Sequence, residues 1–576
     1  MEIKLRRGGE GMDTMERILY LRGTDESFLY PDAAYENDYK TLDNIESAAR
    51  RLLRALVKQE HVYVQVDSDC DGYTSAALLL NYMHDIAPNT VERNWVYGLH
   101  KAKLHGIDID SIPEGTNLVI APDSSSNERD KHAALSDRGI DVIVLDHHEA
   151  DDTRGDTATI VNNQLCGYAN KSLSGVGVVY KTLQCADSLV GKDGASKYLD
   201  LVALGLVGDM MDMRNPETNY YIHEGFQNVN NPFVVYLADK NEFSMKGQYN
   251  PHSVAWFIVP FINAVTRIGS DEDKLLVFES MLSWKAGQLV LSDKRGAKGE
   301  EELRVVQAVR HASNIKRHQD DEKKKLLESM YDKIQKYNLA DEPLLIIQNK
   351  GVEDDDPIRG ITGLVANALM AEFTKPTLIL NEITDPETGE ILWSGSGRGF
   401  NTASIDNWRD YINNTGLAVF AQGHAMAFGV AFTPAGLEKF KQRVREDFGT
   451  IRFEKTYEVD FVWTMADNFD TPIVDIGRYK DIWGQGVPEP VVALEHIKIT
   501  DPVQINLLNK GTLRIDLKPH QTSLIKFGSN VDEYQNLLDK TITVIGTCQI
   551  NDWNGYNTPQ IQIIDYFFET VSAWDF

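Results

Sequence analysis

Three short apolar runs in the first 165 residues each end in acidic residues. VYVQV (62–66) is followed by DSDCDG, NLVIA (117–121) by PDSSS, and DVIVL (141–145) by DHHEAD. Apolar runs of this length that alternate with helical periodicity are typical of parallel strands in βαβ units. Because the carboxyl ends of parallel strands meet at one edge of a sheet, we expect the three acidic clusters to converge there.

The rest of the chain predicts further regions. Residues 300–337 are highly charged with sparse apolar positions, which indicates a long, partly exposed helix. Strand and helix patterns then alternate again, and from about residue 455 short strands dominate, about five of them, which favours an OB-type barrel. We predict an α/β protein built from an N-terminal extension (1–54), a parallel-sheet domain (55–295), a connector helix (296–338), a smaller α/β domain (339–452) and a C-terminal β-barrel (453–576).

Composition excludes several classes of protein. Hydrophobic residues at 42% and charged residues at 25% exclude a collagen-like, coiled-coil or wholly disordered chain. With 58 Lys and Arg against 86 Asp and Glu the net charge is −28, so the average field repels phosphate backbones. The cysteines form no CxxC pair, which argues against a disulfide framework or zinc ribbon. We find no signal peptide or membrane span and expect a cytoplasmic protein.

The first acidic cluster favours bound cations. Asp67, Asp69 and Asp71 occupy alternate positions after a strand, and Gly72 leads into a helix. Carboxylates this close repel one another unless cations hold them. A calcium EF-hand is excluded because its position 12 would be Leu78, where a bidentate Glu is required. A solvated acidic turn remains the alternative for this motif alone.

The other clusters extend the same pattern. Asp123 follows the second strand, and Asp146, His147 and His148 follow the third. Asp209, at the end of an apolar helix, adds one more carboxylate, although it could equally cap that helix. Carboxylates with one or two imidazoles favour manganese or magnesium over zinc. Two such ions would activate water and stabilise an in-line displacement at phosphorus, so the residues predict phosphodiester hydrolysis.

The motifs resemble a known family. VDSDCDG, APDSSS, LDHHEAD and LVGDMMDM, in that order, resemble the four motifs of the DHH phosphoesterase superfamily. GITGLVANALM, SGSGRGF and AQGHAMAFG resemble the DHH-associated domain, and the last region resembles the OB-fold domain of RecJ-like exonucleases. The resemblance covers about residues 55–570. It implies a two-metal exonuclease that degrades single-stranded DNA from the 5′ end in DNA repair, recombination or replication.

The resemblance also implies roles for individual residues. The implied ligands of two Mn²⁺ or Mg²⁺ ions are Asp69, Asp71, Asp123, His147 and Asp209, with Asp123 between the ions. The implied catalytic residues are Asp67 and Asp146, which would orient ligands, and His148, which would face the scissile phosphate. The implied phosphate-binding residues are Ser396, Arg398 and His424. The candidate base-stacking aromatics are Trp483, Phe527, Trp553 and Tyr556, for which filling the barrel core is the alternative.

Two other functions stay open at this point. The same chemistry would serve an oligoribonuclease or a cyclic-dinucleotide phosphodiesterase, although a dinucleotide enzyme has little use for a C-terminal β domain. A catalytically inactive scaffold that binds nucleic acid or a replication partner fits poorly with a complete ligand set. We expect single-stranded DNA or RNA as substrate, a single-strand-binding protein or helicase as protein partner, no membrane association, and a monomer.

Overall fold

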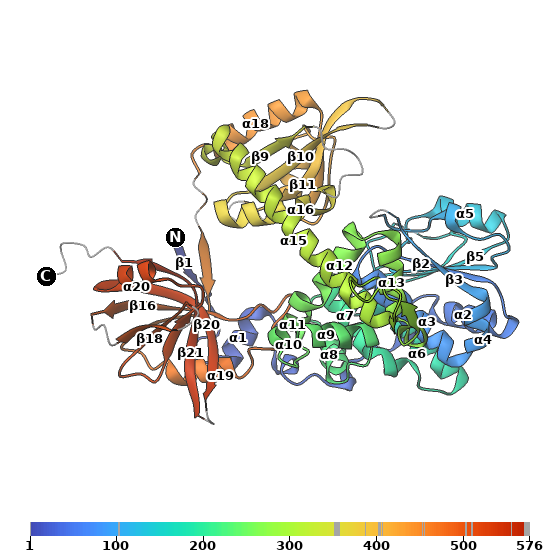
Figure 1. The fold of residues 1–576 in the computed structure, drawn as a ribbon, viewed down its shortest axis with the longest axis horizontal. Helices are drawn as coiled ribbons and strands as arrows, with labels where there is room; N and C mark the ends of the chain where they lie inside the picture. The colour runs from blue at the N-terminus through green and yellow to red at the C-terminus, as the bar shows by residue number, and fades with distance from the viewer. Residues whose placement is uncertain are drawn as a thin grey trace.

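Three sheets with their own helices make up three lobes (Figure 1). The structure is a computed structural model. It describes residues 2–569 except 102–103, 152, 351–357, 386–387, 401–404, 406, 452, 454, 501–503, 509–510 and 554–555. No helix in this described part is both long and apolar enough to cross a membrane.

The first lobe is built on a parallel sheet, as predicted. Its strands are β2 (Val62–Val66), β3 (Trp95–Leu99), β4 (Leu118–Pro122), β5 (Asp141–Asp146) and β6 (Thr159–Asn162). The strand order is β3-β2-β4-β5-β6, and all neighbours pair in parallel. Every residue of β2 and β4 is buried, because helices cover both faces of such a sheet. The strand β3 was not predicted.

Helices fill the rest of this lobe. They are α2 (Ile45–Lys58), α3 (Cys70–Ile86), α4 (Pro88–Asn94), α5 (Arg129–Asp137), α6 (Gly175–Val190), α7 (Leu199–Gly208), α8 (Pro216–Gln227), α9 (Pro232–Lys240), α10 (Glu242–Met245), α11 (Pro251–Phe257), α12 (Val259–Ile268), α13 (Asp271–Met281) and α14 (Ser283–Ala286). A small hairpin of β7 (Leu289–Leu291) and β8 (Glu301–Leu303) follows. Helices α3, α6 and α7 pack on one another, and α3 and the end of α7 carry Asp71 and Asp209 to the sheet edge.

The connector predicted from its charge is α15 (Arg304–Lys336), a helix of 33 residues. At 1.5 Å per residue it spans about 50 Å. Its first half buries Val305, Ala308 and Ala312 in the core of the first lobe. Its second half buries Met330 and Ile334 against the second sheet. Because each half contributes to a different core, this single helix fixes the spacing of the two lobes.

The second lobe holds a mixed sheet in the order β12-β13-β11-β10-β9. Its elements are β9 (Leu345–Asn349), α16 (Ile358–Phe373), β10 (Thr377–Thr384), β11 (Ile391–Arg398), α17 (Trp408–Asn414), β12 (Phe420–Gly423), β13 (Ala427–Phe432) and α18 (Pro434–Phe448). Only β9 and β10 run parallel. Helix α16 packs on α12 of the first lobe. The face of the second sheet that α16 covers is therefore turned toward the first lobe.

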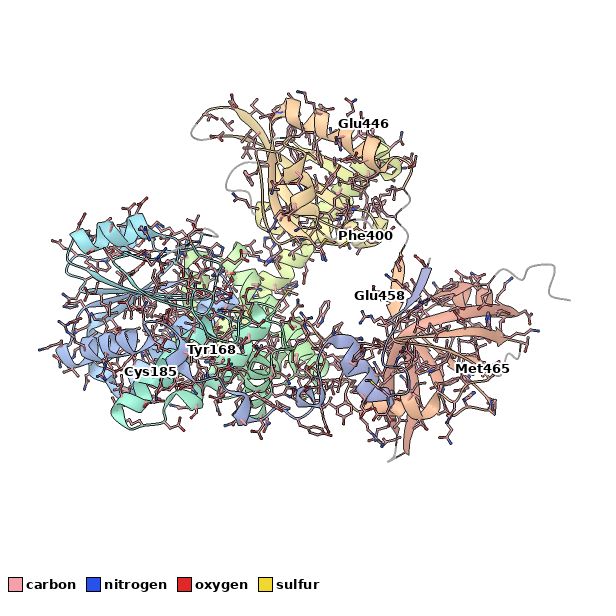
Figure 2. All side chains as sticks on the ribbon, turned by 180° about the vertical axis from the view of Figure 1, so that it is seen from behind. Tyr168, Cys185, Phe400, Glu446, Glu458 and Met465 are labelled. Carbon is pink, nitrogen blue, oxygen red and sulfur yellow. The ribbon has the colours of Figure 1, made fainter. Side chains whose placement is uncertain are left out.

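The C-terminal lobe is one seven-stranded sheet in the order β15-β16-β20-β21-β19-β18-β17. Its strands are β15 (Phe461–Thr464), β16 (Val491–Ile499), β17 (Ile505–Leu508), β18 (Thr512–Asp516), β19 (Ser523–Lys526), β20 (Lys540–Trp553) and β21 (Tyr556–Phe568). Two helices that were not predicted, α19 (Asp470–Gly477) and α20 (Val531–Leu537), accompany it. Figure 2 shows Glu458 of β14 (Thr456–Val459) where the chain enters this lobe.

The N-terminal segment joins the first and last lobes. Strand β1 (Glu2–Leu5) pairs in parallel with β14, and α1 (Thr14–Arg22) packs on α19. Arg22 makes a bidentate ion pair with Asp460, at 2.6 and 2.8 Å, and both side chains are almost fully buried. Further along, the backbone oxygen of Asn37 accepts a hydrogen bond from Lys181 of α6. The first 54 residues therefore connect two lobes and do not merely cover the first.

The buried ion pair gives a stability prediction. Arg22→Met leaves the buried Asp460 with Arg6, at 3.9 Å, as its remaining cationic neighbour and is expected to lower the free energy of unfolding by about 3–5 kcal/mol. Urea unfolding measures this change. The control is Arg50→Met, which removes an exposed pair with Glu46 and should cost less than about 1 kcal/mol. Equal costs for the two variants would contradict the prediction, and Arg22→Met combined with Asp460→Leu should restore much of the loss.

Candidate metal centre

The acidic clusters converge at one edge of the parallel sheet. Asp67 follows β2, Asp123 follows β4, and Asp146 is the last residue of β5. Asp123 and Ser125 have φ of 65° and 84°, a left-handed conformation that turns the chain sharply after the strand. This backbone presents the Asp123 side chain at the shared edge. The convergence predicted from strand topology is confirmed by this geometry.

Three overlapping groups of side chains could each hold a cation. In each group the ligand atoms lie within 4.8 Å of one another. The groups are Asp67, Asp69 and Asp123; Asp71, His147 and Asp209; and Asp123, His147 and His148. Asp123 and His147 each belong to two groups, and all five predicted ligands are included. Groups that share members suit two cations held close together.

The charges of the cluster are unbalanced in the protein alone. Burial and the neighbouring Asp69 raise the pKa of Asp71 to about 6. Burial and the charges of Asp71 and Asp69 raise the pKa of Asp209 to about 8. The pKa of Asp123 is raised well above its usual value, first by burial and then by Asp71. Positive charge is therefore missing from this site.

Two buried atoms at the centre lack a hydrogen-bond partner. They are Oδ1 of Asp123 and Nε2 of His147, which lie 3.2 Å apart. Burial and the neighbouring His148 lower the pKa of His147 to about 4, so its imidazole is neutral at pH 7 and offers a lone pair. Gly175 leaves the room for this arrangement, because a Cβ there would lie 2.3 Å from Oδ1 of Asp123. The donor set fits divalent cations with oxygen and imidazole ligands.

Asp146 belongs to none of the three ligand groups, but it holds the turn that carries His147 and His148. It accepts hydrogen bonds from the backbone N–H of Ser126 at 3.0 Å and of His147 at 2.7 Å. Its Oδ1 is also 2.8 Å from Nδ1 of His148. Burial opposes ionisation of Asp146, but the His148 contact outweighs it and lowers the pKa of Asp146. The same contact raises the pKa of His148 to about 9, which places a half-exposed positive charge beside the cluster.

Two residues of this site carried no signal in the sequence. His105 lies in a loop 38 residues after Asp67, and its Nδ1 is 2.5 Å from Oδ2 of Asp67. Arg267 of α12 lies within electrostatic range of Asp69, and its own burial lowers its pKa. Neither residue belongs to a sequence motif. Each comes close to the acidic cluster only through the packing of the folded protein, so no pattern in the sequence marks it.

Arg267 also links the first lobe to the second. Burial, and then the like charge of Arg267, lower the pKa of Arg398 on β11. No carboxylate among the described residues pairs with either guanidinium. Helix α16 lies against Arg398, since a Cβ at Gly363 would be 2.6 Å from its Nη2. Two adjacent guanidinium groups without acidic partners are suited to bind a phosphate.

The other predicted phosphate-binding residues lie nearby or are exposed. Ser396 Oγ is 3.2 Å from the hydroxyl of Thr362 on α16. His424 is exposed at the turn between β12 and β13. The glycine before Arg398 serves packing of the sheet. A Cβ at Gly397 would lie 2.2 Å from the ring of Phe428, so this glycine permits packing within the sheet.

One base-stacking prediction is corrected. Trp483 is only 4% exposed and stacks on Phe28 at 5.8 Å, so it fills the core between the N-terminal segment and the C-terminal lobe. Phe527 is 60% exposed at the end of β19 and remains a prediction. The side chains of Trp553 and Tyr556 lie outside the described residues.

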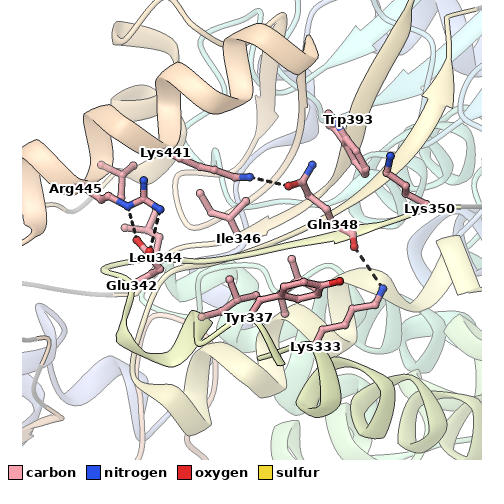
Figure 3. A pocket seen from close by; sticks show the side chains of 13 residues that line it. Lys333, Tyr337, Glu342, Leu344, Ile346, Gln348, Lys350, Trp393, Lys441 and Arg445 are labelled. Carbon is pink, nitrogen blue, oxygen red and sulfur yellow. Dashed lines mark hydrogen bonds and ion pairs between the residues drawn. The ribbon is translucent and has the colours of Figure 1, made fainter. Parts of the chain in front are cut away.

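A separate cavity of about 410 Å³ lies at the β9 edge of the second sheet, between α15 and α18 (Figure 3). Its cations already have partners. Arg445 pairs with Glu342 at 2.8 and 2.9 Å, and Lys441 donates to the side chain of Gln348 at 2.7 Å. Lys333 donates to the backbone oxygen of Gln348. We therefore place no phosphate in this cavity.

Comparison with known proteins agrees with this geometry. Residues 61–206 match the DHH family, N-terminal domain, and residues 466–565 match the RecJ OB domain. YorK of Bacillus subtilis (strain 168), derived from the SPbeta prophage and named for single-strand DNA-specific exonuclease activity, is 34% identical over 566 residues. That alignment covers 96% of this chain and 96% of YorK. The chain belongs to the RecJ family of DHH proteins.

Other RecJ proteins support the same assignment for this RecJ-family protein. The single-stranded-DNA-specific exonuclease RecJ of Bacillus subtilis (strain 168) is 25% identical over 591 residues, covering 98% of this chain and 67% of that protein. The crystal structure of RecJ from Thermus thermophilus in complex with Mn²⁺ has a TM-score of 0.74 at 18% identity. The match covers 99% of this chain and 80% of that one, which shows a common fold. The predicted family and fold class are confirmed.

The raised pKa values of Asp71 and Asp209 predict how this RecJ-family protein responds to pH and metal. Without metal, folded carboxyls keep protons that the unfolded chain has already lost above about pH 4. The free energy of unfolding should therefore fall as pH rises from about 4 to about 8. Mn²⁺ replaces those protons, so it should raise Tm more at pH 8 than at pH 5. Calorimetry in EDTA and in Mn²⁺ measures this, and equal shifts at both pH values would contradict it.

Proposed function

We propose that this RecJ-family protein is a divalent-metal-dependent exonuclease that hydrolyses single-stranded DNA from the 5′ end. The observation that carries the proposal is the set of three overlapping ligand groups, in which Asp123 and His147 each belong to two, beside two guanidinium groups that no described carboxylate pairs with. The names of the RecJ relatives support single-stranded DNA as the substrate. The Mn²⁺ and Mg²⁺ complexes of Thermus thermophilus RecJ support either ion as the cofactor.

The residues of the site divide the work. Two divalent cations bound there would activate water and neutralise charge on the phosphate. Neutral His147 supplies a lone pair, and Asp146 holds the two histidines in place through their backbone N–H groups. His148 carries a positive charge at pH 7 and would contact the scissile phosphate. Arg267 and Arg398 would bind the phosphate at the 5′ end, which would set the direction of degradation.

The remaining lobes would guide the strand. We propose that residues 339–452 close over the site and contribute Ser396 and His424, and that residues 453–576 hold the strand farther from its end. Of the predicted stacking residues in this lobe, Phe527 is the one whose described side chain is exposed. Because the net charge is −28, capture of a strand depends on these local groups and the cations, and we expect weak binding to intact duplex.

End-labelled digestion tests the proposal. With Mn²⁺ or Mg²⁺, a 5′ label on single-stranded DNA should be released early and a 3′ label late, while blunt duplex stays intact. RNA strands, short oligoribonucleotides and cyclic dinucleotides of matched sequence form the control panel. Preferential hydrolysis of short ribonucleotides would favour an oligoribonuclease or cyclic-dinucleotide phosphodiesterase. Early release of the 3′ label would overturn the direction.

Removal of the C-terminal lobe is a poor test of substrate class for this chain. Strand β1 pairs with β14, and Arg22 is buried against Asp460. Truncation near residue 455 would leave the N-terminal segment without these partners. The substrate panel on the full chain avoids this problem.

A further inference from the structure

A small apolar cavity lies beside the metal centre, where the first lobe meets the C-terminal lobe. Its volume is about 200 Å³. Helix α11, which contributes one wall, packs on α7 and lies between α7 and the C-terminal lobe (Figure 1). The volume of the cavity is below the roughly 300–1,000 Å³ of pockets that enclose drug-sized ligands. The cavity therefore suits a group about as large as one planar ring system.

The floor and the rim of this cavity differ in exposure. The floor is formed by buried apolar side chains, namely Leu206, Met213, Ile222 and Trp483. On the rim, Trp256 is 65% exposed and Met210 is 64% exposed. His252 is also exposed, and its ring lies 6.1 Å from that of Trp256. Exposed aromatic and thioether groups around an apolar floor leave a large apolar surface in contact with water, which is typical of a binding site.

The C-terminal lobe closes one side of the cavity. The backbone N–H of Met213 donates to the oxygen of Gln485 at 2.9 Å. Gly484 permits this contact, because a Cβ there would lie 2.3 Å from the sulfur of Met213. The cavity is thus built by two lobes that are far apart in the sequence.

Two residues that line the cavity lie next to a residue of the metal centre along the chain. Met210 and Met211 line the cavity and directly follow Asp209, whose carboxylate lies 3.4 Å from Nε2 of His147. Adjacent residues are separated by about 3.8 Å along the chain. A phosphodiester backbone held at the cations would therefore pass within reach of the cavity.

We propose that this cavity binds one nucleobase of the strand, next to the phosphate held at the metal centre. The proposal rests on the proposed function and names the substrate group that this part of the site recognises. Trp256 stacks on the base, and Met210 and His252 contact its edges. Stacking on an aromatic face accepts any base, so the cavity adds affinity for unpaired strands without adding sequence preference. In a duplex the base is stacked and paired, so it cannot enter.

The test uses strands that lack a single base. In an Asp123→Asn background, which we expect to bind without cutting, affinity is measured with Mn²⁺ for a series of 5′-phosphorylated strands. Each strand has one abasic site at a different position from the 5′ end. One position is expected to show a loss of affinity of about 5- to 100-fold. Trp256→Ala should lose that dependence and bind the intact strand as weakly as the abasic one, whereas Trp256→Phe should retain most of it.

A matched control separates stacking from a general loss of apolar surface. Phe243 on α10 is 91% exposed and does not line the cavity, so Phe243→Ala should keep the dependence on that position. Thermal melts show whether Trp256→Ala folds, as expected for so exposed a side chain. Uniform sensitivity at all positions, or Trp256→Ala binding as tightly as the parent, would overturn the proposal.

A fluorescent base gives a second measurement that does not depend on hydrolysis. With 2-aminopurine at the sensitive position, binding should quench the fluorescence through stacking on Trp256, and Trp256→Ala should abolish the quenching. If the wild-type protein cuts no single strand but shows this quenching, the proposed function fails and the base site stands. If it cuts single strands without quenching or position dependence, the base site fails and the proposed function stands.

Discussion

Asp123→Asn is expected to lower hydrolysis of single-stranded DNA by more than about 100-fold while making the metal-free protein more stable. Loss of a group that only supports a metal ligand costs about 10–100-fold. Asp123 is a member of two ligand groups, so its loss should cost more. In EDTA the raised pKa of Asp123 means that the folded protein must either keep a proton on this carboxyl or bury its charge beside acidic neighbours, and Asn has neither cost, so we expect a gain of about 0.5–2 kcal/mol in the free energy of unfolding.

Rates on labelled strands and urea unfolding in EDTA measure the two effects. The control is Asp137→Asn, which changes an exposed carboxylate at the end of α5 and should affect neither. Activity within about tenfold of the wild type would contradict the assignment of Asp123 as a shared ligand. A loss of stability in EDTA would contradict the electrostatic account of the cluster.

Arg398→Met and Arg267→Met are each expected to lower kcat/KM for 5′-phosphorylated strands by about 10–100-fold. A hydrogen bond to a charged group contributes about 1.5–3 kcal/mol, which corresponds to that range. For strands with a 5′ hydroxyl, kcat/KM should fall much less in both variants, because these strands lack the phosphate that the two guanidinium groups would bind. Arg398→Lys should recover only part of the rate, since an ammonium group cannot form the bidentate contact.

The comparison of 5′-phosphate and 5′-hydroxyl strands separates phosphate binding from a structural role. The control is Arg443→Met, which removes an exposed guanidinium on α18. The two half-buried arginines repel each other, so either replacement should leave stability unchanged or raise it. A loss of activity that is equal on both kinds of strand would contradict a 5′-phosphate site.

The fold of the first lobe followed from the sequence because its signals are local. Strands β2, β4 and β5 are apolar runs that acidic motifs end, and a parallel sheet places all such ends at one edge. This rule predicted that Asp67, Asp123 and Asp146 lie close together without knowledge of any contact between them. The strand β3 was missed because Trp95–Leu99 follows a short helix and lacks the acidic ending of its neighbours.

Groups that reach the site by packing were not predictable in the same way. Arg267 comes from a helix without a motif, and it meets Arg398 only because α15 and α16 hold the second lobe against the first. The exposure of aromatic residues was equally undetermined. Trp483 was predicted to stack on bases, yet Phe28 from the N-terminal segment covers it.

By itself the sequence determined the candidate ligand types, the order of the four acidic motifs and the meeting of the three strand-end motifs at one sheet edge, because strand topology converts spacing along the chain into position. Only the tertiary structure decided which side chains lie close enough to share a cation, how β1 and Arg22 tie the first residues to the last lobe, and where Trp256 and Met210 frame a cavity. These features depend on contacts between elements hundreds of residues apart, and no local pattern encodes such contacts.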